Sequence, residues 1–146
     1  MKIYLDTCSL QRPLDVKSQP RIALEAEAVL AIIELYEAGL LDLVSSRVLL
    51  FETQRNRHPW RREYALDVLA KAKSHVEIDQ QVKEKARELE SHGIAPLDAL
   101  HLASAIAAGC DWFCTCDDKL LRRASGIETG VTKVASPLTL ITEIDT

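Results

Sequence analysis

The 146-residue sequence has little of what marks secreted, membrane or nucleotide-binding proteins. No apolar run is long enough to span a bilayer, and the start, MKIYLD, does not resemble a signal peptide. Only five glycines are present, and none stands in a G-x-G-x-x-G or G-x4-G-K-[ST] pattern, which excludes the dinucleotide-binding and phosphate-loop classes. We therefore expect a cytoplasmic protein with no membrane segment.

Cysteine is also scarce, and its spacing does not indicate a metal site. Cys110, Cys114 and Cys116 form a C-x3-C-x-C pattern that differs from zinc-binding patterns and lacks an accompanying histidine pair. In a cytoplasmic protein all four cysteines of this chain, Cys8 included, are expected to be small buried residues. Cys8 stands apart because it follows an acidic residue, Asp6, by two positions.

Positive charge is not in excess, because the net charge is −4, and bulk electrostatics do not indicate nucleic-acid binding. One segment, RNRHPWRR over residues 55–62, is nevertheless basic. It contains Arg55, Arg57, Arg61 and Arg62. Two interpretations stay open: a surface that binds phosphates, or a solvated connection between two helices broken by Pro59.

What is present is the composition of a soluble globular protein, with 47% hydrophobic and 27% charged residues in a length that suits one domain over residues 1–146. Short apolar runs alternate with longer helical patterns. The pattern predicts strands over 2–5, 41–46, 74–78, 111–115 and 132–136. It predicts helices over 21–39, 47–57, 60–72, 80–92, 97–108, 118–125 and 137–144. This alternation favours an α/β fold, with a mostly parallel sheet of about five strands flanked by helices on both faces.

Four acidic residues stand where such a fold places its binding site, beyond the carboxyl ends of the strands. Asp6 ends the first predicted strand, Glu52 lies in the helix after the second, Asp98 begins an apolar helix, and Asp117 ends the fourth strand. Singly, each has a structural explanation as a cap, a turn or a surface residue. Together they repel, at about 4 kcal/mol for a like pair 4 Å apart near a protein surface.

A carboxylate cluster of this kind needs raised pKa values or a divalent cation. Oxygen ligands without accompanying histidine or thiolate pairs favour Mg²⁺ or Mn²⁺. Such a cation suits phosphodiester hydrolysis, because it activates water and stabilises the developing charge.

Four segments occur in order along nearly the whole chain: IYLDT, SSRVLLFE, PLDALHLASAIAAG and DWFCTCDDKLL. With these segments the sequence resembles the PIN-domain nucleases, especially the small VapC-type toxins of bacterial toxin–antitoxin pairs. The resemblance implies a three-layer PIN-like fold and metal-dependent cleavage of RNA. It also implies that Asp6, Glu52, Asp98 and Asp117 are catalytic, with the three aspartates as metal ligands, and that Thr115 supplies a supporting hydroxyl.

The resemblance further implies an antitoxin partner and a homodimer, for which the helix over 21–38 offers a surface if it does not simply pack on the sheet. The sequence departs from the family pattern at Cys8, where Asn or Ser is common. The polar segment 11–20 is either a mobile loop over the site or a surface connection. His101, three residues after Asp98, is expected to be a packing residue rather than a catalytic one.

Two other functions are alternatives to a nuclease. A phosphotransfer enzyme also places an aspartate after its first strand, but a phosphatase of the haloacid-dehalogenase type needs a second one where this chain has Cys8. A receiver-type domain needs an acceptor aspartate after the third strand, where only Asp79, at a helix cap, is present. A catalytically weak or inactive module that binds RNA or a protein partner remains the main alternative.

Overall fold

The computed structural model describes residues 1–144, which form one five-stranded sheet. In chain order the strands are β1 (Lys2–Leu5), β2 (Asp42–Ser46), β3 (Ser74–Val76), β4 (Trp112–Cys114) and β5 (Lys133–Ala135). Their order in the sheet is β3-β2-β1-β4-β5, and every neighbouring pair is parallel. The first strand of the chain therefore lies in the middle of the sheet, between strands from both halves of the sequence.

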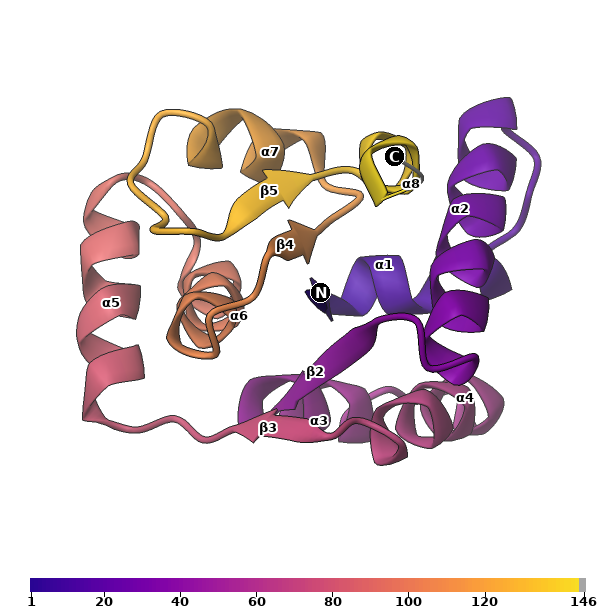
Figure 1. Ribbon diagram of the computed structural model, residues 1–146, viewed down its shortest axis with the longest axis horizontal. Helices are drawn as coiled ribbons and strands as arrows, with labels where there is room; N and C mark the ends of the chain where they lie inside the picture. The colour runs from indigo at the N-terminus through magenta and orange to yellow at the C-terminus, as the bar shows by residue number, and fades with distance from the viewer. Residues whose placement is uncertain (145–146) are drawn as a thin grey trace.

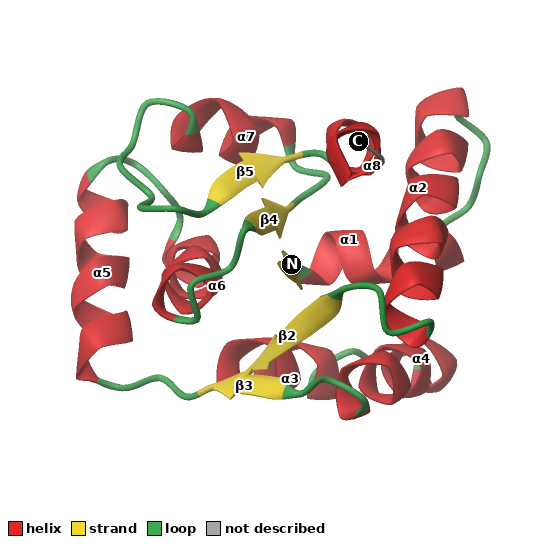
Figure 2. Cartoon of the chain, viewed as in Figure 1, coloured by secondary structure: helices red, strands yellow, loops and turns green. Residues whose placement is uncertain are grey.

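Helices cover both sides of this sheet. They are α1 (Thr7–Gln11), the 3-10 turn η1 (Arg12–Leu14), α2 (Pro20–Glu37), α3 (Arg47–Gln54), α4 (Pro59–Ala70), α5 (Gln80–Ser91), α6 (Pro96–Ala107), α7 (Asp118–Ala124) and α8 (Pro137–Ile144). Figure 1 shows α5 and α6 on one side of the sheet and α2 with α8 on the other. In Figure 2 the strands occupy the middle of the molecule with helices around them, which confirms the predicted three-layer α/β class.

The strands are apolar because both faces of the sheet are covered. In β1, Ile3, Tyr4 and Leu5 are all buried, and the Tyr4 ring stacks on Phe113 of β4 with the ring centroids 5.4 Å apart. Burying one side chain of this size stabilises the fold by about 1.5–3 kcal/mol. The central strand is thus fixed firmly at the point where its carboxyl end approaches the candidate site.

The structure differs from the predicted elements in the region after β1. The helices α1 and η1 were not predicted, because five and three residues are too few to show a helical repeat of apolar positions. The helix predicted over 47–57 ends earlier, at Gln54, and α4 begins at Pro59, where the missing N–H of proline costs nothing.

The segment from residue 11 to residue 20 is held in place by ion pairs. Arg12 lies 3.2 Å from the buried carboxylate of Glu25 in α2. Asp15 accepts a hydrogen bond from Arg61 of α4 at 3.0 Å. These contacts tie the segment to two helices, as expected of a surface connection.

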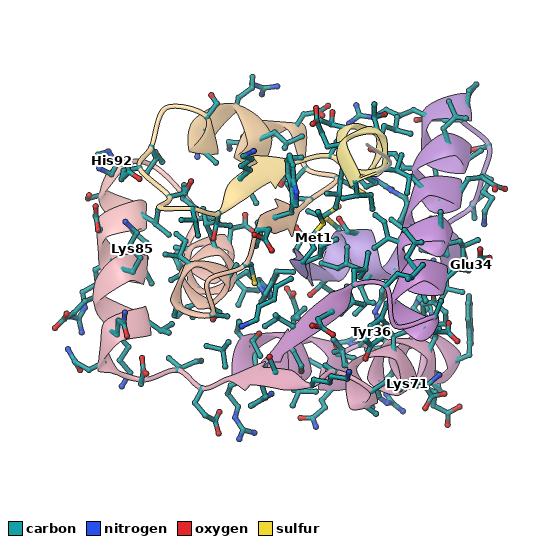
Figure 3. All side chains as sticks on the ribbon, viewed as in Figure 1. Met1, Glu34, Tyr36, Lys71, Lys85 and His92 are labelled. Carbon is teal, nitrogen blue, oxygen red and sulfur yellow. The ribbon has the colours of Figure 1, made fainter. Side chains whose placement is uncertain are left out.

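The long helix α2 packs inward along its apolar face, with Ile32 and Ile33 buried. At its far end the Tyr36 hydroxyl donates a hydrogen bond to a backbone carbonyl of α4 at 3.4 Å, and Lys71, directly after α4, lies 3.6 Å from Glu37. Figure 3 shows Tyr36 and Lys71 near each other where these helices meet. Within residues 1–144, no helix combines the length and apolar character that crossing a membrane requires.

Candidate active site

The carboxyl ends of β1 and β4 open into a small pocket near the middle of the sheet. The strand order changes direction between these two strands, which is where open α/β sheets bind their ligands. The pocket has a volume of about 130 Å³. It is lined by Asp6, Thr7, Cys8, Glu52, Asp98, His101 and Asp117. The structure therefore brings all four predicted carboxylates to one pocket.

Asp6 lies between β1 and α1 and is almost fully buried. Its Oδ1 atom accepts hydrogen bonds from the backbone N–H of Ser9 at 3.0 Å and from the thiol of Cys8 at 3.1 Å. The first of these bonds caps α1. Burial nevertheless raises the pKa of Asp6 well above its ordinary value, because the charged form loses contact with water. Keeping this carboxylate ionised is therefore unfavourable unless positive charge lies nearby.

Thr115 connects Asp6 to Asp117. The Thr115 side chain is fully buried and hydrogen-bonds to the Asp6 carboxylate, while its hydroxyl oxygen accepts the backbone N–H of Asp117 at 3.1 Å. Asp117 in turn caps α7, accepting the N–H groups of Lys119 and Leu120 at 2.9 and 3.2 Å. One hydroxyl thus sets the relative position of the acids that follow β1 and β4.

Glu52 extends from α3 into the pocket and is held by its neighbours. Its Oε1 atom lies 2.9 Å from Nε2 of His101 and also accepts a hydrogen bond from Thr7. The other ring nitrogen of His101 lies 2.7 Å from the Tyr4 hydroxyl, which is 2.7 Å from the hydroxyl of Ser46. Burial opposes ionisation, but the hydrogen bonds from His101 and Thr7 prevail and lower the pKa of Glu52. Oε2 of Glu52 has no hydrogen-bond partner among residues 1–144.

Asp98 lies in the first turn of α6, two residues after Pro96. Unlike Asp6 and Asp117, it does not cap its helix, because Ala95 stands at the cap position. Its carboxylate has no hydrogen-bond or ion-pair partner in the described part of the chain. Burial, together with the nearby charge of Asp117, raises the pKa of Asp98. The nearby His101 opposes this rise, but burial and the charge of Asp117 prevail, so the ionised form of Asp98 is unfavourable in the metal-free pocket.

Comparison with known proteins identifies the family. A family model for the PIN domain matches residues 3–126. The chain belongs to the PIN-domain family. Among solved structures it is similar to a chain in the crystal structure of VapBC2 from Rickettsia felis bound to a DNA fragment from their promoter. That similarity has a TM-score of 0.61 and 14% sequence identity, covers 92% of this chain and 99% of the other, and concerns the fold. Among the curated proteins, none matches the chain.

PIN-domain nucleases typically use divalent metal ions, so the pocket can be tested for its fit to one. The three aspartates offer only oxygen ligands, which suit Mg²⁺ or Mn²⁺. Two of them, Asp6 and Asp98, have raised pKa values that a cation would relieve. Across residues 1–144, however, no three histidine, cysteine, aspartate or glutamate side chains already converge closely enough to hold a metal ion. The donor chemistry fits a hard cation, which would draw the carboxylates together.

The four arginines predicted to bind RNA lie in two kinds of environment. Arg61 is half-buried and pairs with Asp15 at 3.0 Å, and Arg62 is half-buried and donates to a backbone carbonyl at 2.8 Å. Both hold the start of α4 in place. Arg55 and Arg57 are exposed. Any phosphate contact is therefore more accessible to Arg55 and Arg57 than to the other two.

Cys8 is where this PIN domain departs from the pattern expected of its family. Its thiol donates to Asp6 and lies 3.6 Å from the Thr115 hydroxyl, so it takes the place that a serine hydroxyl would take in the pocket. The expectation of buried cysteines is correct for the other three and wrong for Cys8, which is exposed.

Two neighbours of the predicted acids have different roles in the structure. His101 is buried, as expected of a packing residue, and it also contacts Glu52 in the pocket, a contact that the sequence did not predict. The only available signal was its spacing of three residues from Asp98, which puts both on one face of α6. Asp118, beside Asp117, does not line the pocket and pairs with Arg21 at 2.6 Å.

Proposed function

We propose that this PIN domain is a Mg²⁺- or Mn²⁺-dependent endoribonuclease that hydrolyses phosphodiester bonds in RNA. The observation that carries the proposal is the pocket itself, which four carboxylates line at the carboxyl ends of the central strands. The pKa values of Asp6 and Asp98 are raised there, so their ionised forms are unfavourable without positive charge nearby. A bound cation would supply that charge, which favours a functional role for these acids. Asp6, Asp98 and Asp117 would hold the cation.

Further residues in and near the pocket have a part in this activity. A bound divalent cation supplies an activated water and stabilises charge on the phosphate. Glu52 offers its Oε2 atom to orient that water, because its Oε1 atom is occupied by His101 and Thr7. His101 is a positioning residue, since it acts through Glu52. Arg55 and Arg57 are the exposed cations available to the RNA backbone.

We further propose that the protein is the toxin of a type II toxin–antitoxin pair, with an antitoxin protein as partner, a homodimeric state and a cytoplasmic location. Similarity of fold to a chain of VapBC2 supports this placement. The single sheet and its continuous apolar core support one domain over the chain.

The direct test is incubation of structured RNAs with the wild type and with Asp6→Asn, each with and without Mn²⁺. We expect cleavage only by the wild type with Mn²⁺, because asparagine keeps the helix cap of Asp6 and removes the charge. Circular dichroism shows whether both proteins are folded. Equal cleavage by Asp6→Asn would refute the assignment of the site.

A second candidate is a PIN-fold module that binds RNA or a protein without cleaving. Cys8 at a position where Asn or Ser is common favours this candidate, as does the lack of a preassembled metal cluster in residues 1–144. Titration with Mn²⁺ during thermal unfolding separates the two, since binding to the folded state raises the melting temperature. No rise at millimolar Mn²⁺ would favour the binding module.

A further inference from the structure

Two cysteines from opposite ends of the chain meet beside the pocket. Cys8 lies in α1 and is exposed, whereas Cys116 lies in the connection between β4 and α7 and is only 7% exposed. Their side chains interact directly, through a hydrogen bond between the two thiols. We call Cys8 and Cys116 the thiol pair. An oxidant can therefore reach one sulfur from solvent, and the second sulfur is in contact with the first.

The surroundings of the thiol pair hold both sulfur atoms in place. The Sγ atom of Cys8 lies 3.1 Å from Oδ1 of Asp6 and 3.6 Å from the hydroxyl of Thr115, the residue before Cys116. The Sγ atom of Cys116 lies 3.7 Å from the hydroxyl of Ser9, the residue after Cys8. Each cysteine is thus in contact with a residue adjacent to the other. The two chain segments approach each other as a disulfide requires.

The other two cysteines do not share this arrangement. Cys110 and Cys114 are fully buried, and neither has a hydrogen bond to another cysteine within residues 1–144. Because oxidation of a thiol depends on its access to the oxidant, both should stay reduced under mild conditions. They provide an internal reference for the thiol pair.

A disulfide in the thiol pair would change the pocket. The bond between the sulfurs is about 2.05 Å long, so the Cys8 sulfur must move towards Cys116. It also loses the proton that it donates to Asp6. The bond would tie α1, which follows Asp6, to the residue before Asp117. A cation in the pocket draws these acids together, and a covalent tie between their segments opposes that movement.

We propose that the thiol pair is an oxidation site, at which a peroxide converts Cys8 and Cys116 to a disulfide that weakens cation binding in the pocket. The effect on cation binding rests on the proposed function, whereas formation of the disulfide does not. In the cytoplasmic location proposed above, disulfides are usually transient and redox-sensing. The pair would make the activity of the pocket depend on oxidants.

The reaction takes two steps. The Cys8 sulfur attacks one oxygen of the peroxide, the O–O bond breaks, and a sulfenic acid and one water form. The Cys116 sulfur then attacks the Cys8 sulfur, the S–O bond breaks, and the hydroxyl leaves as a second water. The two sulfurs lose two electrons, which reduce the peroxide. A thiol reductant restores both thiols.

Peptide mapping tests the site itself. The purified protein is treated with hydrogen peroxide, the excess is removed with catalase, and the remaining thiols are alkylated before digestion. We expect the wild type to lose two of its four free thiols and to give one linked pair of peptides, from around Cys8 and Cys116. Cys116→Ser should give no linked pair, and its Cys8 should gain oxygen instead. Cys110→Ala is the matched control and should form the disulfide as the wild type does.

The rise in melting temperature with Mn²⁺ tests the effect on the pocket, since binding to the folded state sets the size of that rise. The oxidised wild type should lose most of the rise, and dithiothreitol should restore it. Cys8→Ser, compared with its own untreated sample, should respond to Mn²⁺ equally before and after peroxide. Circular dichroism shows whether each protein is folded.

The proposal is overturned if peroxide consumes the Cys8 thiol without linking it to Cys116 in the same molecule. It is also overturned if the disulfide forms and the response to Mn²⁺ is unchanged. A reduced wild type that does not respond to Mn²⁺ at all contradicts the proposed function instead, and the peptide map still decides whether the thiol pair is an oxidation site.

Discussion

Asp6 and Asp117 occupy the same local position in the two halves of the molecule, and their surroundings differ. Each follows a strand, β1 or β4, and these strands are parallel neighbours. Each caps the helix that comes next, α1 or α7, and each is connected to Thr115. Asp6, however, is buried, whereas Asp117 is exposed to solvent.

The difference in burial between Asp6 and Asp117 shows which properties of an acid serve the helix cap and which serve the candidate site. A cap stabilises a helix by about 1 kcal/mol, and asparagine serves as well as aspartate. Neither position therefore needs a negative charge for folding. At Asp6 the charge is unfavourable, because burial raises its pKa. A buried charge that the fold does not need is the pattern expected of a functional group.

The largest effect is expected on cleavage. Asp6→Asn should reduce the rate of RNA cleavage in Mn²⁺ by about 1,000-fold, corresponding to about 4 kcal/mol of lost charge stabilisation. Asp117→Asn should reduce it less, because water partly replaces an exposed carboxylate. Single-turnover assays of both variants measure the difference. Equal losses would mean that burial does not distinguish the two acids in catalysis.

Replacing Thr115 tests whether the two acids depend on one hydroxyl. Thr115→Val should lower the free energy of unfolding by about 1–3 kcal/mol, since the Asp117 N–H loses its buried acceptor and the Asp6 carboxylate loses a donor. Thr115→Ser keeps the hydroxyl and should recover most of that loss. Urea unfolding of the metal-free proteins gives the numbers, and similar values for the valine and serine variants would contradict the bridge.

The cap at α7 gives a smaller effect. Asp117→Ala should lower the free energy of unfolding by about 1 kcal/mol, because the N–H groups of Lys119 and Leu120 lose their acceptor. Asp117→Asn is the control, since it removes the charge and keeps the cap. A difference close to zero in urea unfolding would show that the cap does not stabilise α7.

The smallest effect concerns pH. Because the pKa of Asp6 is raised in the folded protein, the folded state holds a proton that the unfolded state releases above about pH 4. The free energy of unfolding of the metal-free protein should therefore fall as the pH rises from about 4, the pKa of Asp6 in the unfolded chain, towards its raised pKa in the folded protein. Asp6→Asn removes the contribution of Asp6 to this dependence, leaves that of Asp98, and should gain about 0.5–1 kcal/mol at neutral pH. Melting temperatures across pH 4–8 without metal test this, and parallel curves for both proteins would contradict it.

The sequence predicted the parts of this molecule that depend on local pattern. Strands followed by helices predicted a parallel sheet, and the rule that sites lie beyond strand ends placed Asp6 and Asp117 together. Helix α1 was missed because Asp6, and not an apolar repeat, sets its start. No residue pattern in the sequence marks the end of α1 at Gln11.

Contacts between distant residues could not be predicted in the same way. Tyr4 and His101 are 97 residues apart and meet only because β1 lies under α6, so the hydrogen bonds that hold Glu52 have no local signature. The basic segment was recognised from its composition, but composition did not separate Arg61, which pairs with Asp15, from the exposed Arg57.

The order of the strands also affects when the pocket can be assembled during synthesis of the protein. Of the five described strands, β1 is synthesised first and lies in the centre of the sheet. Its neighbour β4 follows far behind, because Lys2 of β1 and Asp111, just before β4, are 109 positions apart. Until β4 and α7 emerge, a nascent chain carries Asp6 and Glu52 without Thr115 or Asp117. The pocket is therefore assembled only after β4 and the start of α7 have been synthesised.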